Sequence, residues 1–250
     1  LLQMNKKSEK LYIILAGIFI ASLVSCNLIF QKFFQIDIWV PFYGNYTFQQ
    51  SVGLLPYPIT FIVTDIISEI YGKKKANDVV TSGLIASLFM LLVVTISDSI
   101  QSAGFGTGNI LAFNPSTGQE ESIFHIVFGL SSAAVFASML AYLFAQYIDV
   151  RVFHFWKKLT KGKHLWLRNN ASTMFSQFID TSIVLALLFY FDVISAPESY
   201  TQMQFFLQLL MNGFLFKVFF AAFDTPIIYG LTHIIRKRLG LKFGEEVTSS

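Results

Sequence analysis

The sequence contains few charged residues and almost no cysteine. Asp, Glu, Lys and Arg make up 13% of its 250 residues, whereas a soluble domain has about 25%, and 54% of the residues are hydrophobic. Water cannot solvate a surface of this composition, so we expect lipid to surround most of the chain. Cys26 is the only cysteine and lies in an apolar run, which excludes a disulfide framework.

Common enzyme motifs are absent as well. The sequence has no G-x-x-x-x-G-K-[ST] phosphate loop, no G-x-S-x-G elbow and no H-E-x-x-H helix, so we expect no ATP hydrolysis and no enzymatic activity. The histidines are scattered without metal-ligand spacing, so neither a metal nor another cofactor is expected. The basic residues punctuate apolar runs and form no basic module, which argues against direct binding of nucleic acid.

Long apolar runs dominate what is present. A transmembrane helix needs about 20 apolar residues, and six runs come close to that length. They predict an all-α integral membrane protein, a six-transmembrane-helix bundle that forms one domain over residues 1–250. The predicted spans are residues 11–31, 53–71, 78–97, 122–148, 170–191 and 204–235.

The basic residues predict the orientation in the membrane. Sixteen of the 18 Lys and Arg residues fall in four clusters, and six spans place all four on one side. Lys32 is the only Lys or Arg residue in the loops on the opposite side, residues 32–52, 98–121 and 192–203. Because Lys and Arg accumulate on the cytoplasmic side, we expect both termini in the cytoplasm. Two three-helix halves would then have opposite orientations, as in inverted repeats.

The second predicted span carries two carboxylates. Asp65 and Glu69 are four residues apart, so both point to the same side of a helix. A charge at mid-membrane costs about 2.5–3.5 kcal/mol on insertion scales, which makes such residues functional candidates. Pro58 leaves at most about 15 regular helical residues in this span, and short helices in membrane carriers tend to mark the binding site.

The sixth predicted span carries Lys217 and Asp224. They are seven residues apart and therefore share a helix face, where they could line one polar cavity. For Lys217, snorkelling to the membrane interface is the structural alternative. Pro226 should kink or loosen this helix, because it removes a backbone hydrogen bond.

The fifth predicted span has a polar stripe. Thr173, Gln177 and Asp180 recur at helical spacing, and Ser172 adjoins them. Lipid cannot satisfy polar groups, so the stripe must face protein or water. It indicates either a binding surface or hydrogen bonds between helices.

Three further polar residues lie within or at the ends of spans. Asn27 in the first span is more typical of interhelical hydrogen bonding than of a site. Gln146 and Asp149 end the fourth span beside Arg151, which indicates either a gate or an ion pair at the cytoplasmic end.

Five strings of residues occur in combination along the chain. They are Ser-Cys-Asn-Leu (25–28), Tyr-Pro-Ile-Thr-Phe-Ile-Val-Thr-Asp (57–65), Ala-Gln-Tyr-Ile-Asp-Val-Arg-Val-Phe (145–153), Leu-Trp-Leu-Arg-Asn-Asn-Ala-Ser-Thr-Met-Phe-Ser-Gln-Phe-Ile-Asp-Thr (165–181) and Phe-Lys-Val (216–218). In this combination the chain resembles the bacterial queuosine precursor transporter family, also described as the vitamin uptake transporter family. The resemblance extends from the first predicted span to the sixth.

The resemblance implies a multi-pass secondary transporter of the bacterial inner membrane. Its substrate would be 7-cyano-7-deazaguanine, 7-aminomethyl-7-deazaguanine or both, imported for tRNA modification. The implied partners are this small molecule and the lipid bilayer; small carriers commonly pair, which leaves a homodimer open. The chain departs from the family at Glu69, where some members carry a base, and at Gln177, where others carry Asn. The recurring polar positions of the family correspond here to Asn27, Asp65, Gln146, Asp149, Ser172, Thr173, Asp180 and Lys217.

The chemistry of a 7-deazaguanine suits these side chains. Two adjacent N–H donors suit one carboxylate, and the neighbouring carbonyl oxygen needs a donor. We expect Asp65 or Asp180 to accept from the two donors while the other carboxylate balances Lys217. The expected carbonyl donors are Lys217, Gln177 or Asn27, and the expected stacking rings are Phe61 or Phe175.

Two other functional classes also fit the residues. A substrate-capturing subunit of an energy-coupling importer for a vitamin-like or nucleobase-like compound is also a small six-helix protein, and it would need a partner ATPase. An intramembrane enzyme acting on lipid could use the same acidic residues, but nucleophile and metal motifs are absent. The surplus of acidic residues within the spans suits protonation through desolvation or an added cation, and the sequence does not separate proton coupling from facilitated diffusion.

Overall fold

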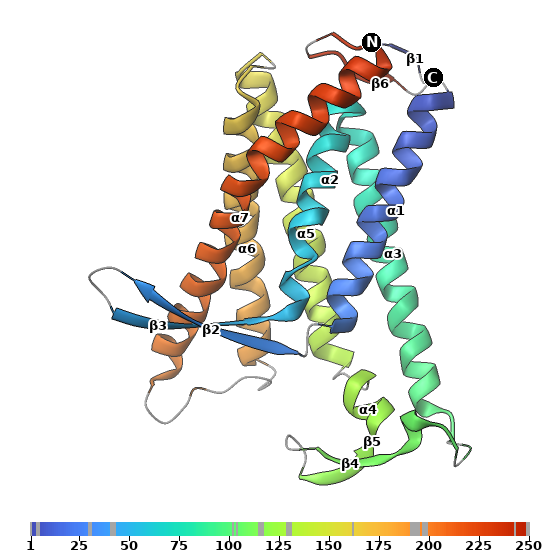
Figure 1. Ribbon diagram of the computed structural model, residues 1–250, viewed down its shortest axis with the longest axis vertical. Coiled ribbons are helices and arrows are strands. Elements are labelled where there is room, and N and C mark those ends of the chain that lie inside the picture. Colours follow the sequence, from blue (N-terminus) through green and yellow to red (C-terminus); the bar gives the residue numbers. More distant parts are fainter. Residues whose placement is uncertain are drawn as a thin grey trace.

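The structure, a computed structural model, is a bundle of long helices with both termini at one end (Figure 1). It describes residues 2–3, 6–29, 32–40, 44–101, 103, 105–114, 118–128, 132–161, 163–190, 196, 200–242 and 244–248. The helices are α1 (Lys6–Ile29), α2 (Tyr57–Ile70), α3 (Gly72–Ser99), α4 (Ile123–Phe128), α5 (Ser132–Leu159), α6 (Leu165–Tyr190) and α7 (Gln202–Leu239).

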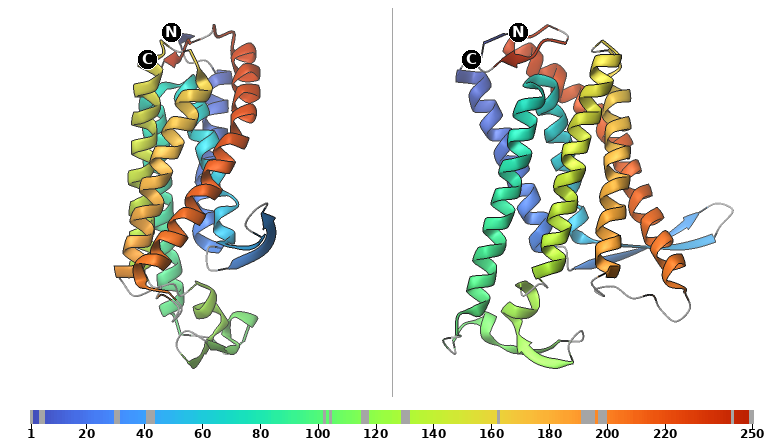
Figure 2. Two further views of the ribbon diagram at one scale, coloured as in Figure 1. Left: turned by 90° about the vertical axis from the view of Figure 1, so that its left-hand side faces the viewer. Right: turned by 180° about the vertical axis from the view of Figure 1, so that it is seen from behind.

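The long helices have the length and hydropathy of a multi-pass membrane protein. Within the described residues, four helical segments are long and apolar enough to cross a membrane: Lys6–Ile29, Val52–Ile70, Gly72–Ser99 and Gln202–Leu239. α5 and α6, with 28 and 26 residues, complete the bundle (Figure 2). The predicted all-α membrane architecture is confirmed at this level, and six spans stay a prediction.

α2 occupies the centre of the bundle. It contacts α1, α3, α5 and α7, and ten of its 14 residues are buried. Pro58 lies in its first turn, where a missing N–H group removes no helical hydrogen bond. At about 1.5 Å per residue the helix is only about 21 Å long, so its first turn begins inside the bundle. The short second helix predicted from Pro58 is therefore present.

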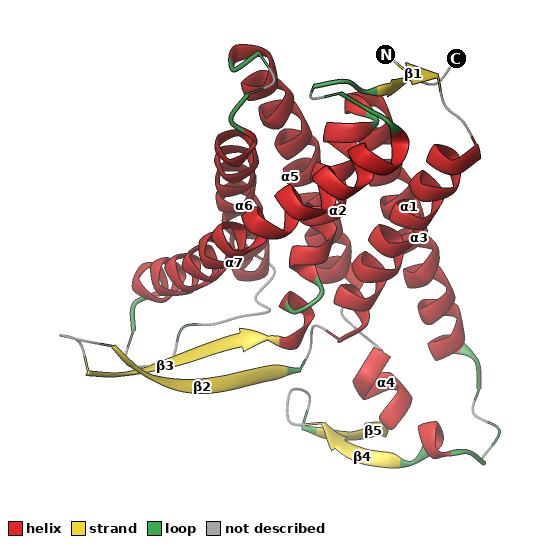
Figure 3. Cartoon of the chain, turned by 45° about the horizontal axis from the view of Figure 1, so that its top comes forward, coloured by secondary structure: helices red, strands yellow, loops and turns green. Residues whose placement is uncertain are grey.

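Small β-hairpins occupy two stretches that the sequence predicted only as loops. β2 (Phe33–Val40) pairs antiparallel with β3 (Gly44–Ser51), and β4 (Leu111–Asn114) pairs with β5 (Gln119–Ser122). Both hairpins lie at the end of the bundle opposite the termini (Figure 3). Their ladders satisfy backbone groups that the helices do not, a long-range pairing that hydropathy does not report. Short 3₁₀ turns accompany them at Val52–Leu54 and Thr107–Asn109.

Several helices extend beyond the predicted apolar runs, and α5 and α7 are two of them. α5 continues to Leu159, past the predicted end at residue 148. The added stretch is amphipathic: Phe153 is fully buried and packs on the bundle, while Arg151 is exposed, so the helix continues although the apolar run has ended. α7 begins with a capping box between Thr201 and Gln204, and it ends at Gly240, whose φ of +67° is left-handed. The fourth predicted span is divided between α4 and α5. Near the termini, β1 (Leu2–Gln3) pairs in parallel with β6 (Val247–Thr248).

Candidate functional site

A buried ion pair joins α6 and α7 next to the first turn of α2. Lys217 Nζ lies 2.7 Å from Asp180 Oδ2 and donates to Thr181 Oγ1 at 2.9 Å. The hydroxyl of Tyr57 donates to the same Asp180 oxygen at 2.5 Å, and Lys217 Nζ lies 4.8 Å from the centre of the Tyr57 ring. The Lys217 and Asp180 side chains are only 9% and 5% exposed. Lys217 therefore points into the bundle and does not snorkel to the interface.

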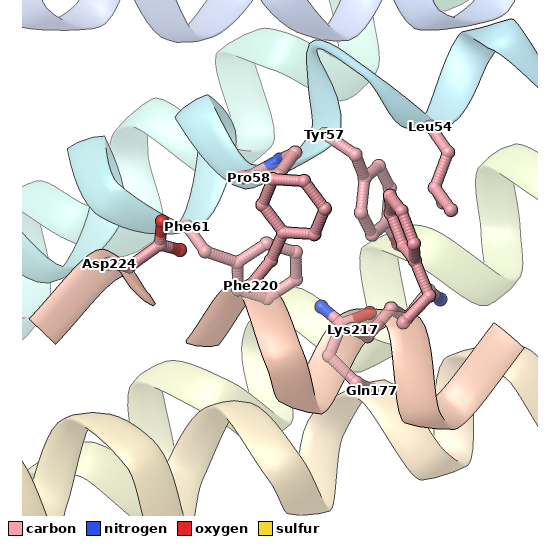
Figure 4. Close-up of a pocket in the computed structure, with 9 residues that line it drawn as sticks. Leu54, Tyr57, Pro58, Phe61, Gln177, Lys217, Phe220 and Asp224 are labelled. Carbon is pink, nitrogen blue, oxygen red and sulfur yellow. The ribbon is translucent and has the colours of Figure 1, made fainter. Parts of the chain in front are cut away.

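A pocket lies beside this ion pair, between α2 and α7. Aromatic rings form much of its wall, and Tyr57 and Phe61 lie with ring centres 5.4 Å apart. A flat apolar ligand can stack in such a wall, while the polar side chains at its edge set the ligand's orientation. Figure 4 shows the pocket with its lining residues Leu54, Tyr57, Pro58, Phe61, Gln177, Phe216, Lys217, Phe220 and Asp224.

The hairpin β2–β3 adds to the outer wall of the pocket. Phe48 of β3 stacks on Phe216 of α7, with ring centres 5.5 Å apart and an angle of 22° between the planes. Phe216 lies 4.5 Å from Phe220, centre to centre, and both line the pocket. An aromatic chain therefore connects the hairpin to the site.

Several polar atoms in the pocket wall or elsewhere in the bundle interior are buried without a hydrogen-bond partner among the described residues. These atoms are Gln177 Nε2 and Oε1, Asp180 Oδ1 and Gln146 Oε1. Gln146 uses its other polar atom, Nε2, to donate to the Tyr142 hydroxyl at 2.7 Å. Leaving a buried polar group without a partner costs about 1–3 kcal/mol. This concentration of donors and acceptors indicates a surface made for a polar ligand.

More polar side chains lie farther along the bundle toward the termini. Asp65 is 1% exposed and follows Phe61 by one helical turn on the same face of α2. Asp149 accepts a hydrogen bond from Ser176 Oγ at 3.0 Å, which joins α5 to α6. Asp149 and Ser172 are both fully buried. These residues continue the polar interior above the pocket, and none of them lines it.

Glu69 lies away from the pocket, at the end of the bundle that carries the termini. Its carboxylate is 2.7 Å from Arg236 Nη2 of α7 and 3.5 Å from Lys157 Nζ of α5. Lys157 also pairs with Glu246 at 2.7 Å. The structure thus places this predicted substrate ligand in an ion cluster that joins α2, α5, α7 and the C-terminal segment.

Other predicted site residues also lie apart from the pocket. Asn27 Nδ2 donates to Ser87 Oγ of α3 at 3.3 Å and lines a separate pocket with Tyr142. The Phe175 side chain is 54% exposed and faces away from the bundle interior, so it does not stack at this site. The Thr173 side chain lies outside the described residues. Asp224, which shares a helix face with Lys217, lines the pocket with it at 5% exposure.

Sequence reasoning missed two tyrosines. Tyr57 bonds to Asp180, and Tyr142 packs against Tyr57 with ring centres 5.2 Å apart. In a hydropathy pattern, a tyrosine within an apolar run is counted with the other aromatic residues, so the pattern gives no sign of its hydrogen-bonding hydroxyl. The signal for Tyr57 was its place between Pro56 and Pro58, at the start of the shortened helix.

Comparisons with known proteins point to transport. A protein of Bacillus subtilis (strain 168) named "Probable queuosine precursor transporter" is 28% identical over 141 residues, which cover 56% of this chain and 56% of that protein. A protein of the same name from Haemophilus influenzae (strain Rd) is 23% identical over 247 residues, 97% of this chain and 95% of that protein. The chain thus matches about half the length of the first relative and nearly all of the second. No solved structure matches.

A family profile gives the broader assignment. The profile of the family described as "Putative vitamin uptake transporter" matches residues 51–231, from the 3₁₀ turn before α2 to the last third of α7. That segment contains Tyr57, Gln177, Lys217 and Asp224 of the pocket, together with the ion-pair residue Asp180. A family of transporters agrees with the expectation that the chain is not an enzyme. Because the match covers well over half of the chain, this protein belongs to the vitamin uptake transporter family.

Proposed function

We propose that this protein imports queuosine precursors across the bacterial inner membrane, as 7-cyano-7-deazaguanine, 7-aminomethyl-7-deazaguanine or both. The observation that carries the proposal is the buried Asp180–Lys217 pair beside an aromatic pocket. A flat, polar-edged heterocycle suits this combination of rings and hydrogen-bonding groups. The printed names of the two relatives support the same class of substrate.

The site can hold the substrate without a large net charge. Lys217 neutralises Asp180, and Tyr57 and Thr181 hold the two charged groups in place. A bound ring would lie against Tyr57 and Phe61 and displace water from the pocket. Asp180 is the carboxylate that balances Lys217, and it does so through Oδ2; Asp65 lies one helical turn beyond the pocket-lining Phe61.

The proposed topology has six spans with both termini in the cytoplasm. The four basic clusters belong to the N-terminal tail, the start of α3, the α5–α6 connection and the end of α7. All four lie at one end of the bundle (Figure 1). That end would face the cytoplasm by the positive-inside rule, and the hairpins would face outward. The first three and the last three of these six spans would form two halves of opposite orientation.

The test is complementation of a bacterium that can neither make nor import queuosine precursors. The strain would receive the gene and low external 7-cyano-7-deazaguanine, and queuosine in its tRNA would be measured. We expect wild-type protein to restore queuosine and a Lys217→Met variant, present in the membrane at equal level, to restore none. Absence of queuosine with wild-type protein in the membrane would contradict the proposal.

A second measurement separates this function from that of an energy-coupling subunit. Purified protein in liposomes, without any partner, is expected to catalyse uptake of the labelled precursor. If the liposomes bind but do not accumulate or equilibrate the precursor, the substrate-capturing alternative is favoured.

A further inference from the structure

The amide of Gln177 is the least satisfied polar group of the pocket. Its side chain is 2% exposed, and both Nε2 and Oε1 lack a hydrogen-bond partner among the described residues. Figure 4 shows the amide pointing from α6 into the pocket. Buried amides are nearly always paired in native proteins. A ligand that pairs with this amide would satisfy a donor and an acceptor at once.

Asp180 provides a third polar atom beside this amide. It follows Gln177 by three residues on α6, so the two side chains lie on one face of the helix. Asp180 Oδ2 already accepts from Tyr57 and Lys217, whereas Oδ1 has no partner in the described part of the chain. Among the described residues, this face of α6 therefore carries one donor and two acceptors without partners, Gln177 in the pocket wall and Asp180 next to it. The ion pair with Lys217 holds the Asp180 carboxylate in place.

We infer that Gln177 and Asp180 together recognise the edge of a guanine-type ring. Gln177 Nε2 donates to the ring carbonyl, Gln177 Oε1 accepts from the ring N–H, and Asp180 Oδ1 accepts from the exocyclic amine. The acceptor and the two donors of that edge are complementary in kind to the one donor and two acceptors of these side chains. This assignment rests on the proposed function, and it names the part of the substrate that the pocket selects.

The assignment divides the edge between two residues. Gln177 contacts the carbonyl and ring N–H, which a hypoxanthine-type ring also has. Asp180 Oδ1 contacts the exocyclic amine, which a hypoxanthine-type ring lacks. A site that hydrogen-bonds a ligand group rejects an analogue without it, because its own buried polar atom is then left unpaired. A change at Gln177 should therefore lower the affinity for both rings without altering the preference for the ring that carries the amine.

The experiment measures equilibrium binding to purified protein by calorimetry. The ligands are 7-cyano-7-deazaguanine and the matched 7-cyano-7-deazahypoxanthine, which lacks only the amine. We expect wild-type protein to prefer the first by at least about tenfold, as loss of one hydrogen bond to a charged group predicts. Gln177→Met should weaken both ligands by about 10- to 100-fold and leave the ratio of their affinities unchanged.

The controls separate recognition from folding. Gln208 lies exposed on α7, so Gln208→Met makes the same chemical change away from the pocket and should bind like wild type. A dissociation constant does not depend on the fraction of inactive protein. If Gln177→Met does not fold, Gln177→Asn keeps the amide one methylene shorter, and it should lose about tenfold for both ligands.

The outcomes distinguish the assignment from the proposed function. If the Gln177 variant binds both ligands like wild type, or wild-type protein binds both equally, the assignment is overturned while the proposed function stands. If wild-type protein binds neither ligand, the proposed function fails and the assignment fails with it.

Discussion

Single side chains set the charge balance of the pocket, and Lys217 is the one whose loss leaves a charge behind. Lys217→Met would leave the Asp180 carboxylate buried without its cation. Breaking a buried ion pair in this way typically costs about 3–5 kcal/mol. We expect a correspondingly lower free energy of unfolding, measured in detergent, and loss of precursor uptake.

Two variants provide the comparison for Lys217. Lys158→Met makes the same change at an exposed position of α5 and should leave stability and uptake unchanged. The double variant Lys217→Met with Asp180→Asn removes both charges, so it should recover much of the stability without recovering uptake. Equal stability of the single and double variants would contradict a buried ion pair.

Asp224 decides, in our interpretation, how the pocket treats the substituent on the substrate ring. It lines the pocket seven residues beyond Lys217 on α7. An aminomethyl group is cationic and can donate to a carboxylate, whereas a cyano group is neutral. We expect Asp224→Asn to weaken competition by the aminomethyl precursor about 10- to 100-fold, as loss of a charge-assisted hydrogen bond predicts.

The same variant should change inhibition by the cyano precursor by no more than about twofold, because the neutral cyano group forms no charge-assisted hydrogen bond with Asp224. The measurement is inhibition of labelled uptake by each unlabelled precursor. Asp78→Asn, at an exposed position of α3, is the matched control. Equal loss for both precursors would show that Asp224 acts on the fold or on transport and not on this substituent.

Whole elements are held together at the end of the bundle that carries the termini. Glu69 of α2 is 2% exposed and faces two cations, from α5 and α7, whereas Glu246 of the C-terminal segment is 30% exposed. Glu69→Gln leaves buried positive charges and should cost about 3–5 kcal/mol of unfolding free energy. Glu246→Gln makes the same change at a more exposed position and should cost less, about 0–1 kcal/mol.

Chemical unfolding of both variants measures this difference. A similar loss for the two would contradict the view that the cluster is a buried connection between helices. The cluster closes the bundle at the end that we propose faces the cytoplasm, so in the transport cycle it would have to open for release of substrate.

Element prediction from the sequence succeeded where one local cause was sufficient. The short α2 follows from Pro58, whereas α7 continues to Leu239, past the predicted end at residue 235. The hairpin of β2 and β3 was missed because its ladder joins residues up to 18 positions apart, from Phe33 to Ser51. A periodicity search along one stretch of chain does not detect a partner on another.

The orientation of the whole molecule can be tested by labelling from one side. The background is Cys26→Ser, because Cys26 is the only cysteine and is buried. Lys74 and Glu120 are exposed at opposite ends of the bundle. In intact cells whose outer membrane is permeabilised, we expect a membrane-impermeant maleimide to label Glu120→Cys and to miss Lys74→Cys.

Opening the inner membrane should make Lys74→Cys reactive as well. The reverse pattern would place the termini outside and overturn the proposed topology. Equal labelling of both positions before opening would contradict an odd number of crossings between them. The positive-inside rule predicts the first pattern, because the basic clusters share one end.

The sequence by itself determined that this is a membrane protein, where its long helices lie and which family it resembles. Low charge and long apolar runs indicate a membrane protein, and the motif strings indicated a family that the profile match confirms. Helical spacing also showed which polar residues share one face, as Gln177 and Asp180 do. These properties are local, because they depend on residues within a few turns of one another.

Only the tertiary structure decided which of those faces meet. Asp180 pairs with Lys217; Glu69 pairs with Arg236, 167 positions away; and Phe175 points outward. Spacing along one helix defines its faces but leaves its rotation against the neighbouring helices open. That rotation is set by packing and ion pairing across the whole bundle, which brought Tyr57, Gln177 and Lys217 to one pocket.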